Sequence, residues 1–172
     1  MKMAPNHFNP ENKNIYHGYF PFLPSDVSHK EFYDMPRPLE DISDWERNGC
    51  PLYEFIPWVD SDPEQTYEKV RIAFVEHFRR MHALALKLLS CLSIGVGKSA
   101  NYFDPWFKDE CSSVFRAIRY EPRKNGGAGL DLKTEELKLV TPEHTDSGFI
   151  TLLSTFMFQG LQVEIDGEYK SI

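Results

Sequence analysis

The middle of the chain has the clearest pattern, because its apolar residues recur every three or four positions. That spacing places them on one face of an α-helix. Asp62 and Pro63 precede the pattern and suit the N-cap and the first helical position. We predict a long helix over residues 63–94 that ends before Gly95 and Gly97. Its apolar face, which we expect to be buried, consists of Val70, Ala73, Phe74, Phe78, Met81, Leu84, Ala85, Leu88, Leu89 and Leu92.

The residues before this helix show little periodicity and are rich in proline, acidic and aromatic residues. Residues 16–22 are aromatic enough for a short strand that stops at Pro24. Residues 25–63 are expected to be ordered but irregular, with at most one-turn helices. We therefore interpret residues 1–62 as an irregular N-terminal segment with one short strand.

After the helix, short apolar runs alternate with turn signals. Asp166-Gly167 is the pair expected in a tight hairpin, and residues 126–129, with three glycines, form a predicted loop. A short turn or helix is predicted over 101–107, and strands over 113–120, 137–140, 149–153, 161–165 and 169–172. A long helix followed by antiparallel strands predicts an α+β chain, mainly β, in which the helix packs on a sheet sandwich or jelly roll.

The composition and net charge of the chain indicate which classes of binding partner are not expected. The chain has 26 acidic and 19 basic residues, a net charge of −7 and no basic stripe, so we expect no nucleic-acid partner. Its three cysteines are widely spaced, as expected of reduced, buried or half-buried thiols in a cytoplasmic protein. The sequence contains no signal peptide and no apolar run long enough to cross a bilayer, so no membrane partner is expected.

One pair of residues suggests metal chemistry, because His144 and Asp146 lie two positions apart. In an extended segment such side chains point to the same side, so an imidazole and a carboxylate can share one metal ion. Non-haem Fe(II) oxygenases hold iron with two histidines and one carboxylate and leave other positions open. The spacing alone arises often by chance, and a solvated His144 with a capping Asp146 is then the better interpretation.

The residues that follow this pair favour the metal hypothesis. They form an ordered series of Gly148, Thr151-Leu152-Leu153, Gly160-Leu161-Gln162-Val163 and Gly167-Glu168-Tyr169. The series resembles the isopenicillin N synthase-like branch of the Fe(II)- and 2-oxoglutarate-dependent dioxygenases. Earlier segments that agree with this resemblance are Gly18-Tyr19, Lys30-Glu31-Phe32-Tyr33-Asp34, Asn101-Tyr102-Phe103 and the strand from Arg116 to Pro122.

The resemblance implies a partial double-stranded β-helix, or jelly roll, that is packed against one long helix and has an incomplete barrel. Residues 95–172 would be the first part of that domain. His144 and Asp146 would bind Fe(II), and Tyr120 would contact the cosubstrate or the substrate. An aromatic side chain packed in the barrel mouth is the alternative for Tyr120. Ile118 stands where the family often has an asparagine.

The same resemblance implies an oxidoreductase that uses Fe(II) and O2, with 2-oxoglutarate as cosubstrate. It would hydroxylate or desaturate a small organic molecule and release carbon dioxide and succinate. Some relatives on this fold oxidise their substrates without 2-oxoglutarate, so both modes stay open.

A second histidine for the iron is the missing part of the pattern. No histidine follows His144 in the sequence, whereas the family carries a distal histidine and an Arg-x-Ser pair further on. His77 and His82 are five positions apart on the predicted helix, so they do not share a face. The remaining histidines, for which we expect surface roles, are His7, His17 and His29.

We therefore expect the chain to be the middle part of such an enzyme, with weak iron binding and no turnover by itself. An unclosed sheet would expose edge strands that favour self-association. Two other hypotheses stay open. One is a non-catalytic binding or scaffold protein derived from the fold, and the other is an iron site completed by a histidine from another subunit.

Overall fold

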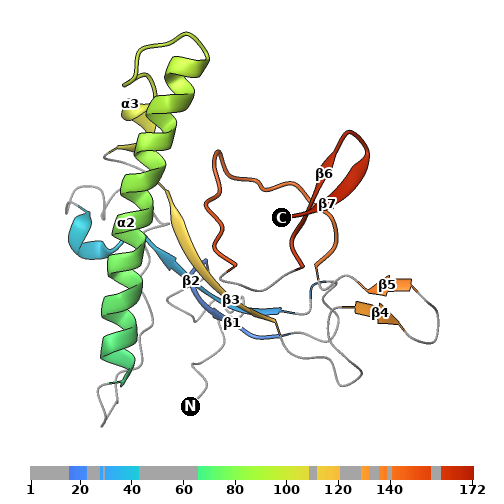
Figure 1. Ribbon diagram of the computed structural model, residues 1–172. Coiled ribbons are helices and arrows are strands. Elements are labelled where there is room, and N and C mark those ends of the chain that lie inside the picture. The colour runs from blue at the N-terminus through green and yellow to red at the C-terminus, as the bar shows by residue number, and fades with distance from the viewer. Residues whose placement is uncertain are drawn as a thin grey trace.

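A long helix and a three-stranded antiparallel sheet form the largest connected part of the structure (Figure 1). The sheet has the order β1-β2-β3, with β1 at Gly18–Phe20, β2 at Lys30–Pro36 and β3 at Val114–Tyr120. The helix is α2, Thr66–Gly95. The computed structural model describes residues 16–22, 28, 30–42, 66–108, 112–120, 129–131, 136–138, 141–155 and 160–172.

The sheet has two different faces, because cross-strand neighbours in an antiparallel pair point to the same side. Tyr33 and Met35 of β2 are buried together with Val75 and Phe78 of α2, and Phe115 of β3 packs against them. This is the helix face of the sheet. Burial of these aromatic and aliphatic side chains is the main force that holds α2 on the sheet.

The other side of the sheet, which we call the open face, points away from α2. It carries two of the three charged positions of β2. Four cross-strand pairs of β2 and β3 lie on it, namely Lys30 with Tyr120, Phe32 with Ile118, Asp34 with Arg116, and Pro36 with Val114. The segment 141–155 lies on the side of the sheet away from α2 (Figure 1).

The end of α2 is capped by backbone hydrogen bonds. Gly97 has a φ of 74°, and its N–H donates to the carbonyl of Ile94 at 2.9 Å. The N–H of Lys98 donates to the carbonyl of Ser93 at 2.8 Å, which completes a Schellman motif. The predicted long helix is thus present and ends at Gly95, one residue later than predicted. Its predicted start at Asp62 lies outside the described residues.

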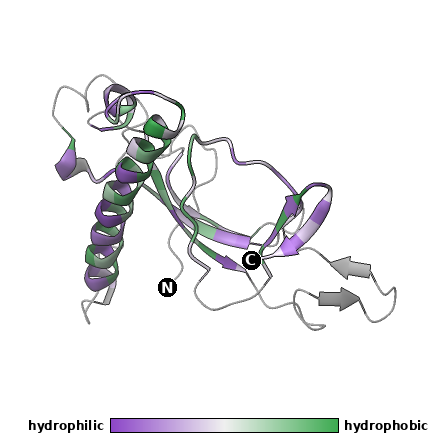
Figure 2. Cartoon of the chain, turned by 45° about the horizontal axis from the view of Figure 1, so that its top comes forward, coloured by the Kyte–Doolittle hydropathy of each residue, from purple (hydrophilic) through white to green (hydrophobic). Residues whose placement is uncertain are grey.

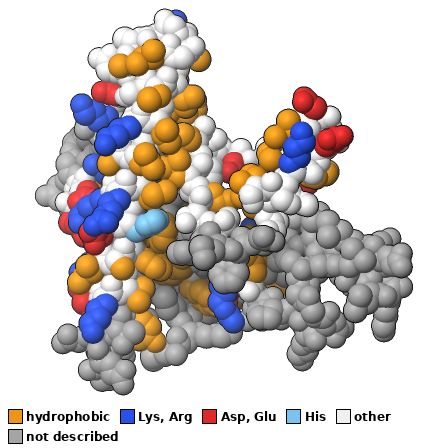
Figure 3. Space-filling model, in the orientation of Figure 1, with side chains coloured by type: hydrophobic (Ala, Val, Ile, Leu, Met, Phe, Trp, Pro, Cys, Tyr) orange, Lys and Arg blue, Asp and Glu red, His pale blue; other side chains and the backbone are white. Residues whose placement is uncertain are grey.

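Only part of the predicted apolar face of α2 is buried against other described residues. Phe78 and Leu89 are buried, whereas Leu84, Leu88 and Leu92 are 36–47% exposed. Figure 2 shows apolar and polar stripes side by side along the helix, and Figure 3 shows a band of hydrophobic side chains on its visible surface. The prediction that the whole face is buried is wrong for the described structure, because a three-stranded sheet covers only one side of a wider apolar arc.

β2 contradicts the prediction of irregular structure for residues 25–63. It is the central strand of its sheet, with β1 and β3 as partners on its two sides. The adjacent Phe32 and Tyr33 point to opposite faces, so the apolar and polar alternation that marks a half-buried strand is hidden. The short 3-10 helix η1 (Leu39–Asp41) agrees with the one-turn helices expected there.

The strands after β3 are short and form two separate hairpins. The second, β6 (Gln162–Ile165) with β7 (Glu168–Ser171), turns at Asp166 and Gly167, whose φ values are 55° and 81°. Two consecutive positive φ values define the tight turn that the Asp-Gly pair predicted. The first hairpin pairs β4 (Gly129–Asp131) with β5 (Glu136–Lys138).

Two parts of the prediction for residues after α2 differ from the structure, and one agrees with it. β4 was not predicted and begins inside the predicted glycine loop, of which residues 126–128 lie outside the described residues. The predicted strand over 149–153 is absent, because this stretch has no ladder with a described strand. The predicted turn or helix over 101–107 is present as α3 (Asp104–Phe107).

All described strands pair antiparallel, and the three sheets are separate, with no closed barrel among the described residues. One long helix with antiparallel sheets supports the α+β class. No helix in the described part of the chain is long and apolar enough to cross a membrane.

Candidate functional site

The predicted iron ligands lie side by side in a segment without regular secondary structure. His144 Nε2 is 3.6 Å from Asp146 Oδ1, and both side chains are more than half exposed. Two ligands at about 2.1 Å from one divalent ion lie at most about 4.2 Å apart, so the observed separation suits a shared ion. The prediction that the two side chains point the same way agrees with this geometry.

The tautomer of His144 also suits a metal ligand. Its Nδ1 lies 2.9 Å from the carbonyl oxygen of Pro142, which can only accept, so Nδ1 carries the proton and donates. In the neutral imidazole the lone pair is then on Nε2, the atom that faces Asp146. Metal-bound histidines usually have such a hydrogen bond from the other ring nitrogen, because it fixes the ring and the tautomer.

A third ligand is not found near this pair. Among the described residues, no group of three His, Cys, Asp or Glu side chains is placed to hold a metal ion. Within the described ranges the donor set is therefore this pair of neighbouring side chains.

The described histidines of the N-terminal half have packing roles. His17 precedes β1 and is only 6% exposed, so the surface role expected for it is wrong. On α2, His77 lies edge-on to Phe115 with ring centres 5.2 Å apart, and His82 stacks on Phe78 at 6.0 Å. Both rings belong to the helix side of the sheet. His7 and His29 lie outside the described residues.

The thiols are also partly outside the described ranges. Cys91 on α2 is free and exposed, so the expectation of a buried or half-buried thiol is wrong there. Cys50 and Cys111 are not among the described residues.

An aromatic cluster anchors the chain just after Asp146. Phe149 lies edge-on to Phe103 and tilted to Phe107, with ring centres 5.1 Å apart in both cases. Trp106 of α3 continues the cluster through Phe103. Such aromatic pairs stabilise a contact by about 0.5–1.5 kcal/mol beyond area burial. The segment that carries the two ligands is thus attached to the turn after α2.

On the other side of the pair, Tyr169 of β7 donates a short hydrogen bond to the carboxylate of Glu143. This bond, with the nearby negative charge, raises the pKa of Tyr169 to about 12. The residue before His144 is therefore held by the C-terminal hairpin.

Tyr120 lies at the end of β3, beside the start of the same segment. Its hydroxyl accepts a long hydrogen bond of 3.5 Å from Thr141, three residues before His144. Tyr120 is 46% exposed, and the alternative of an aromatic side chain packed in the barrel mouth stays a prediction. Its predicted contact with cosubstrate or substrate stays a prediction.

Arg116 is an arginine near the ligand pair that the sequence interpretation did not single out. Its Nε and Nη2 donate to the two carboxylate oxygens of Asp34 at 2.6 and 2.7 Å, and its guanidinium lies 4.2 Å from the ring centre of Phe32. The bonds to Asp34 raise the pKa of Arg116, and the charge of Asp146 adds to this shift. The signal in the sequence was the two-residue alternation of β3, which places Arg116 on the same face as Tyr120.

Comparison with known proteins agrees with the order of motifs. No protein-family model matches the chain. Isopenicillin N synthase from Amycolatopsis lactamdurans is 30% identical over 175 residues, which cover 96% of this chain and 50% of that protein. The chain belongs to the isopenicillin N synthase-like family. Isopenicillin N synthase from Streptomyces clavuligerus is 28% identical over 174 residues, with the same coverage of both chains.

Plant members of this family also match. Gibberellin 20 oxidase 3 of Arabidopsis thaliana is 32% identical over 106 residues, or 62% of this chain and 25% of that protein. The family predicted from the motif order is thereby confirmed. The chain spans about half the length of the isopenicillin N synthases that it matches.

Proposed function

We propose that His144 and Asp146 are two ligands of an Fe(II) centre in an oxidoreductase that oxidises a small organic molecule with O2. The observation that carries this proposal is the pair itself. Its donor atoms lie 3.6 Å apart, and in the neutral imidazole the hydrogen bond from His144 to Pro142 leaves the lone pair on the nitrogen that faces Asp146. Membership of the isopenicillin N synthase-like family supports the same chemistry.

Five residues of the candidate site have separate roles. His144 binds through Nε2 and Asp146 through one carboxylate oxygen, while Phe149 and Glu143 position the segment between them. When bound, the iron supplies open positions at which O2 and an organic ligand react. Tyr120 contacts the cosubstrate, for which we propose 2-oxoglutarate, and the strands belong to a jelly roll with an incomplete barrel.

The 172-residue chain is expected to bind Fe(II) weakly and to show no turnover by itself, because the described residues supply two ligands rather than three. The outer strands β1 and β3 each leave one edge without a partner among the described strands. We propose that these edges favour self-association, which sedimentation at increasing protein concentration measures.

Metal titration tests the iron proposal. Co(II), which replaces Fe(II) and has visible absorption bands, is titrated into the 172-residue protein and its variants under anaerobic conditions. His144→Ala and Asp146→Ala should each weaken binding by about tenfold or more, because even outer partners of metal ligands change affinity by about 10–100-fold. The matched control is His77→Ala, another exposed histidine, which should leave the affinity unchanged.

The opposite result has a definite meaning. Equal Co(II) affinity in wild type, His144→Ala and His77→Ala would overturn the iron proposal and favour the non-catalytic binding or scaffold protein. Consumption of 2-oxoglutarate with Fe(II) by the 172-residue chain would overturn the expected lack of turnover.

A further inference from the structure

The open face of the sheet carries an apolar row beside two cations. The row consists of Phe20, Phe32 and Ile118, which the register places side by side on β1, β2 and β3. Phe20 and Phe32 stack with ring centres 4.6 Å apart. The Arg116 guanidinium lies 4.2 Å and the Lys30 ammonium 6.0 Å from the ring centre of Phe32. An apolar surface with cations at its margin suits a ligand that has an apolar body and a negative group.

Arg116 is held in one orientation on this face. Its Nε and one N–H of Nη2 are directed at the buried carboxylate of Asp34, and its plane packs on Phe32. The outer edge, made by Nη1 and the second N–H of Nη2, has no acceptor among the described residues. The side chain is 44% exposed. A guanidinium fixed in this way presents a preformed fork to a carboxylate.

The charges of the open face leave room for one more anion. Arg116 and Lys30 are two cations, and among the described residues Asp34 is the single carboxylate hydrogen-bonded to Arg116. Asp146 is near enough for its charge to act on Arg116. Among the described residues, however, these two side chains form no direct ion pair. An acid bound to Arg116 would therefore lie near the candidate metal pair.

We propose that the open face binds a small carboxylic acid, with its carboxylate on the outer edge of Arg116 and its apolar body on Phe20, Phe32 and Ile118. The inference deepens the proposed function and rests on it in one respect. The acid is taken to be the molecule that is oxidised at His144 and Asp146, whereas its binding to Arg116 is independent of the metal.

A purely structural role is the competing explanation for the Arg116–Asp34 pair. It joins β2 to β3 across 82 positions of the sequence and compensates a carboxylate that is 6% exposed. Removal of Arg116 alone leaves that carboxylate buried without its partner, which destabilises the fold. A variant that removes both charges, Asp34→Asn with Arg116→Gln, avoids this problem.

The test compares an acid with its neutral isostere in the metal-free 172-residue protein. Equilibrium dialysis at low ionic strength gives the dissociation constants of 4-phenylbutyrate and 4-phenylbutyramide. We expect the acid to bind about tenfold more tightly than the amide, as a charge-assisted fork predicts. Arg116→Gln and the Asp34→Asn/Arg116→Gln double variant should bring this ratio to about one. The matched control is Arg119→Gln, which alters an arginine of the same strand that pairs with Glu31 on the helix face.

Each outcome decides between the two roles of Arg116. A ratio near one in wild type, or an unchanged ratio in the folded double variant, overturns the proposal and leaves a structural ion pair. If Arg119→Gln also bound 4-phenylbutyrate and 4-phenylbutyramide equally well, the proposal for Arg116 would be overturned too. Co(II) titration of the same samples separates the two proposals. Loss of Co(II) binding in His144→Ala with no acid preference defeats only the acid site. An Arg116-dependent preference with Co(II) binding indifferent to His144 defeats only the iron proposal.

Discussion

The hydroxyl of Tyr169 donates a hydrogen bond to the carboxylate of Glu143, the residue directly before His144. These two residues are 26 positions apart, and one of them lies on the C-terminal hairpin. Phe149 provides a second attachment on the other side of the ligand pair, through Phe103 and Phe107. The exposed segment that carries His144 and Asp146 is therefore held at both ends by side chains from different elements.

Replacement of Tyr169 by Phe should loosen the first attachment. We expect Co(II) affinity to fall severalfold, because His144 loses the support of its neighbour, while the unfolding midpoint in urea changes little. Tyr102→Phe is the control, since this exposed tyrosine lies in the aromatic cluster and not at Glu143. Equal Co(II) affinity in wild type and Tyr169→Phe would show that the hydrogen bond does not position the ligands.

The same bond should depend on pH in the alkaline range. Tyr169 donates only while it is protonated, and its pKa in the folded protein is about 12, above the ordinary value of about 10. Its contribution is therefore fully present below pH about 10 and is lost as pH rises through about 12. The tyrosinate absorbance of wild type minus that of Tyr169→Phe measures this titration. A midpoint near 10 would contradict the contact.

Replacement of Phe149 by Ala should loosen the second attachment. Two ring contacts are lost, and because the side chain is 59% exposed we expect a loss of about 1 kcal/mol in the free energy of unfolding. Co(II) affinity should fall as well, since the chain after Asp146 gains freedom. Leu153→Ala is the control with the same exposure, 59%, and should change neither quantity by more than about 0.5 kcal/mol.

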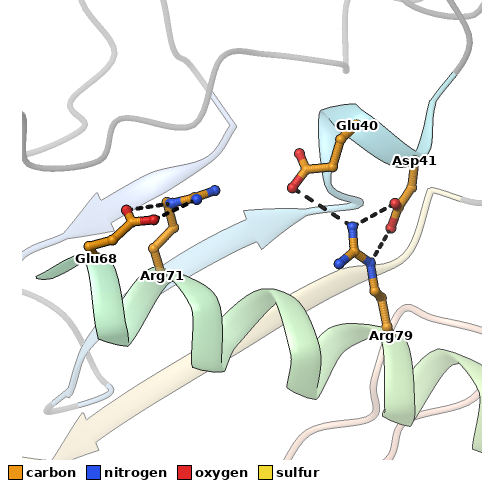
Figure 4. Close-up of polar contacts among 5 residues, drawn as sticks. All are labelled: Glu40, Asp41, Glu68, Arg71 and Arg79. Atoms are coloured by element: carbon orange, nitrogen blue, oxygen red, sulfur yellow. Dashed lines mark hydrogen bonds and ion pairs between the residues drawn. The ribbon is translucent and has the colours of Figure 1, made fainter.

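The bond between Arg79 of α2 and Asp41 of η1 should stabilise the fold modestly (Figure 4). Arg79 donates to both oxygens of Asp41, at 2.8 and 2.7 Å, whereas Arg71 pairs with Glu68 within the helix. Because Arg79 is about half exposed, Arg79→Ala should cost about 0.5–1 kcal/mol in urea unfolding. Arg80→Ala, which removes an ion pair within α2, is the control and should cost less.

The Arg79–Asp41 pair also predicts a pH dependence in acid. The hydrogen bond from Arg79 lowers the pKa of Asp41. The stabilisation is then present above pH about 4, the ordinary range for an aspartate, and is lost as pH falls through the lowered pKa. Unfolding in urea across this range should converge for wild type and Arg79→Ala at the acidic end. A constant difference at all pH values would contradict the assignment.

The uneven burial of α2 should appear in the effects of truncation. Phe78 is 5% exposed in the core, so Phe78→Ala should cost about 3 kcal/mol or more in the free energy of unfolding. Leu84 is 43% exposed, so Leu84→Ala should cost no more than about 0.5 kcal/mol. A large cost at Leu84 would show that residues outside the described ranges cover this side of the helix.

Short-range sequence patterns were sufficient to predict the elements whose hydrogen bonds join residues close together in the sequence. The spacing of apolar residues predicted α2, because a helix closes its hydrogen bonds within four residues. The turn at Asp166 and Gly167 followed from residue type, since Gly accepts a positive φ without a steric penalty and Asp tolerates it. The order of motifs around His144 and Asp146 was sufficient to predict the family.

The tertiary structure decided everything that depends on distant partners. β2 exists because Lys30–Pro36 pairs with Val114–Tyr120, more than 75 positions later, and no local pattern records that partner. The same pairing places Arg116 on Asp34, which the sequence did not suggest. The folded chain also buries His17 directly before β1. It also decides which apolar side chains of α2 are covered. A sequence states which side chains can form a core or a site, but burial and charge pairing are properties of neighbours that only the folded chain brings together.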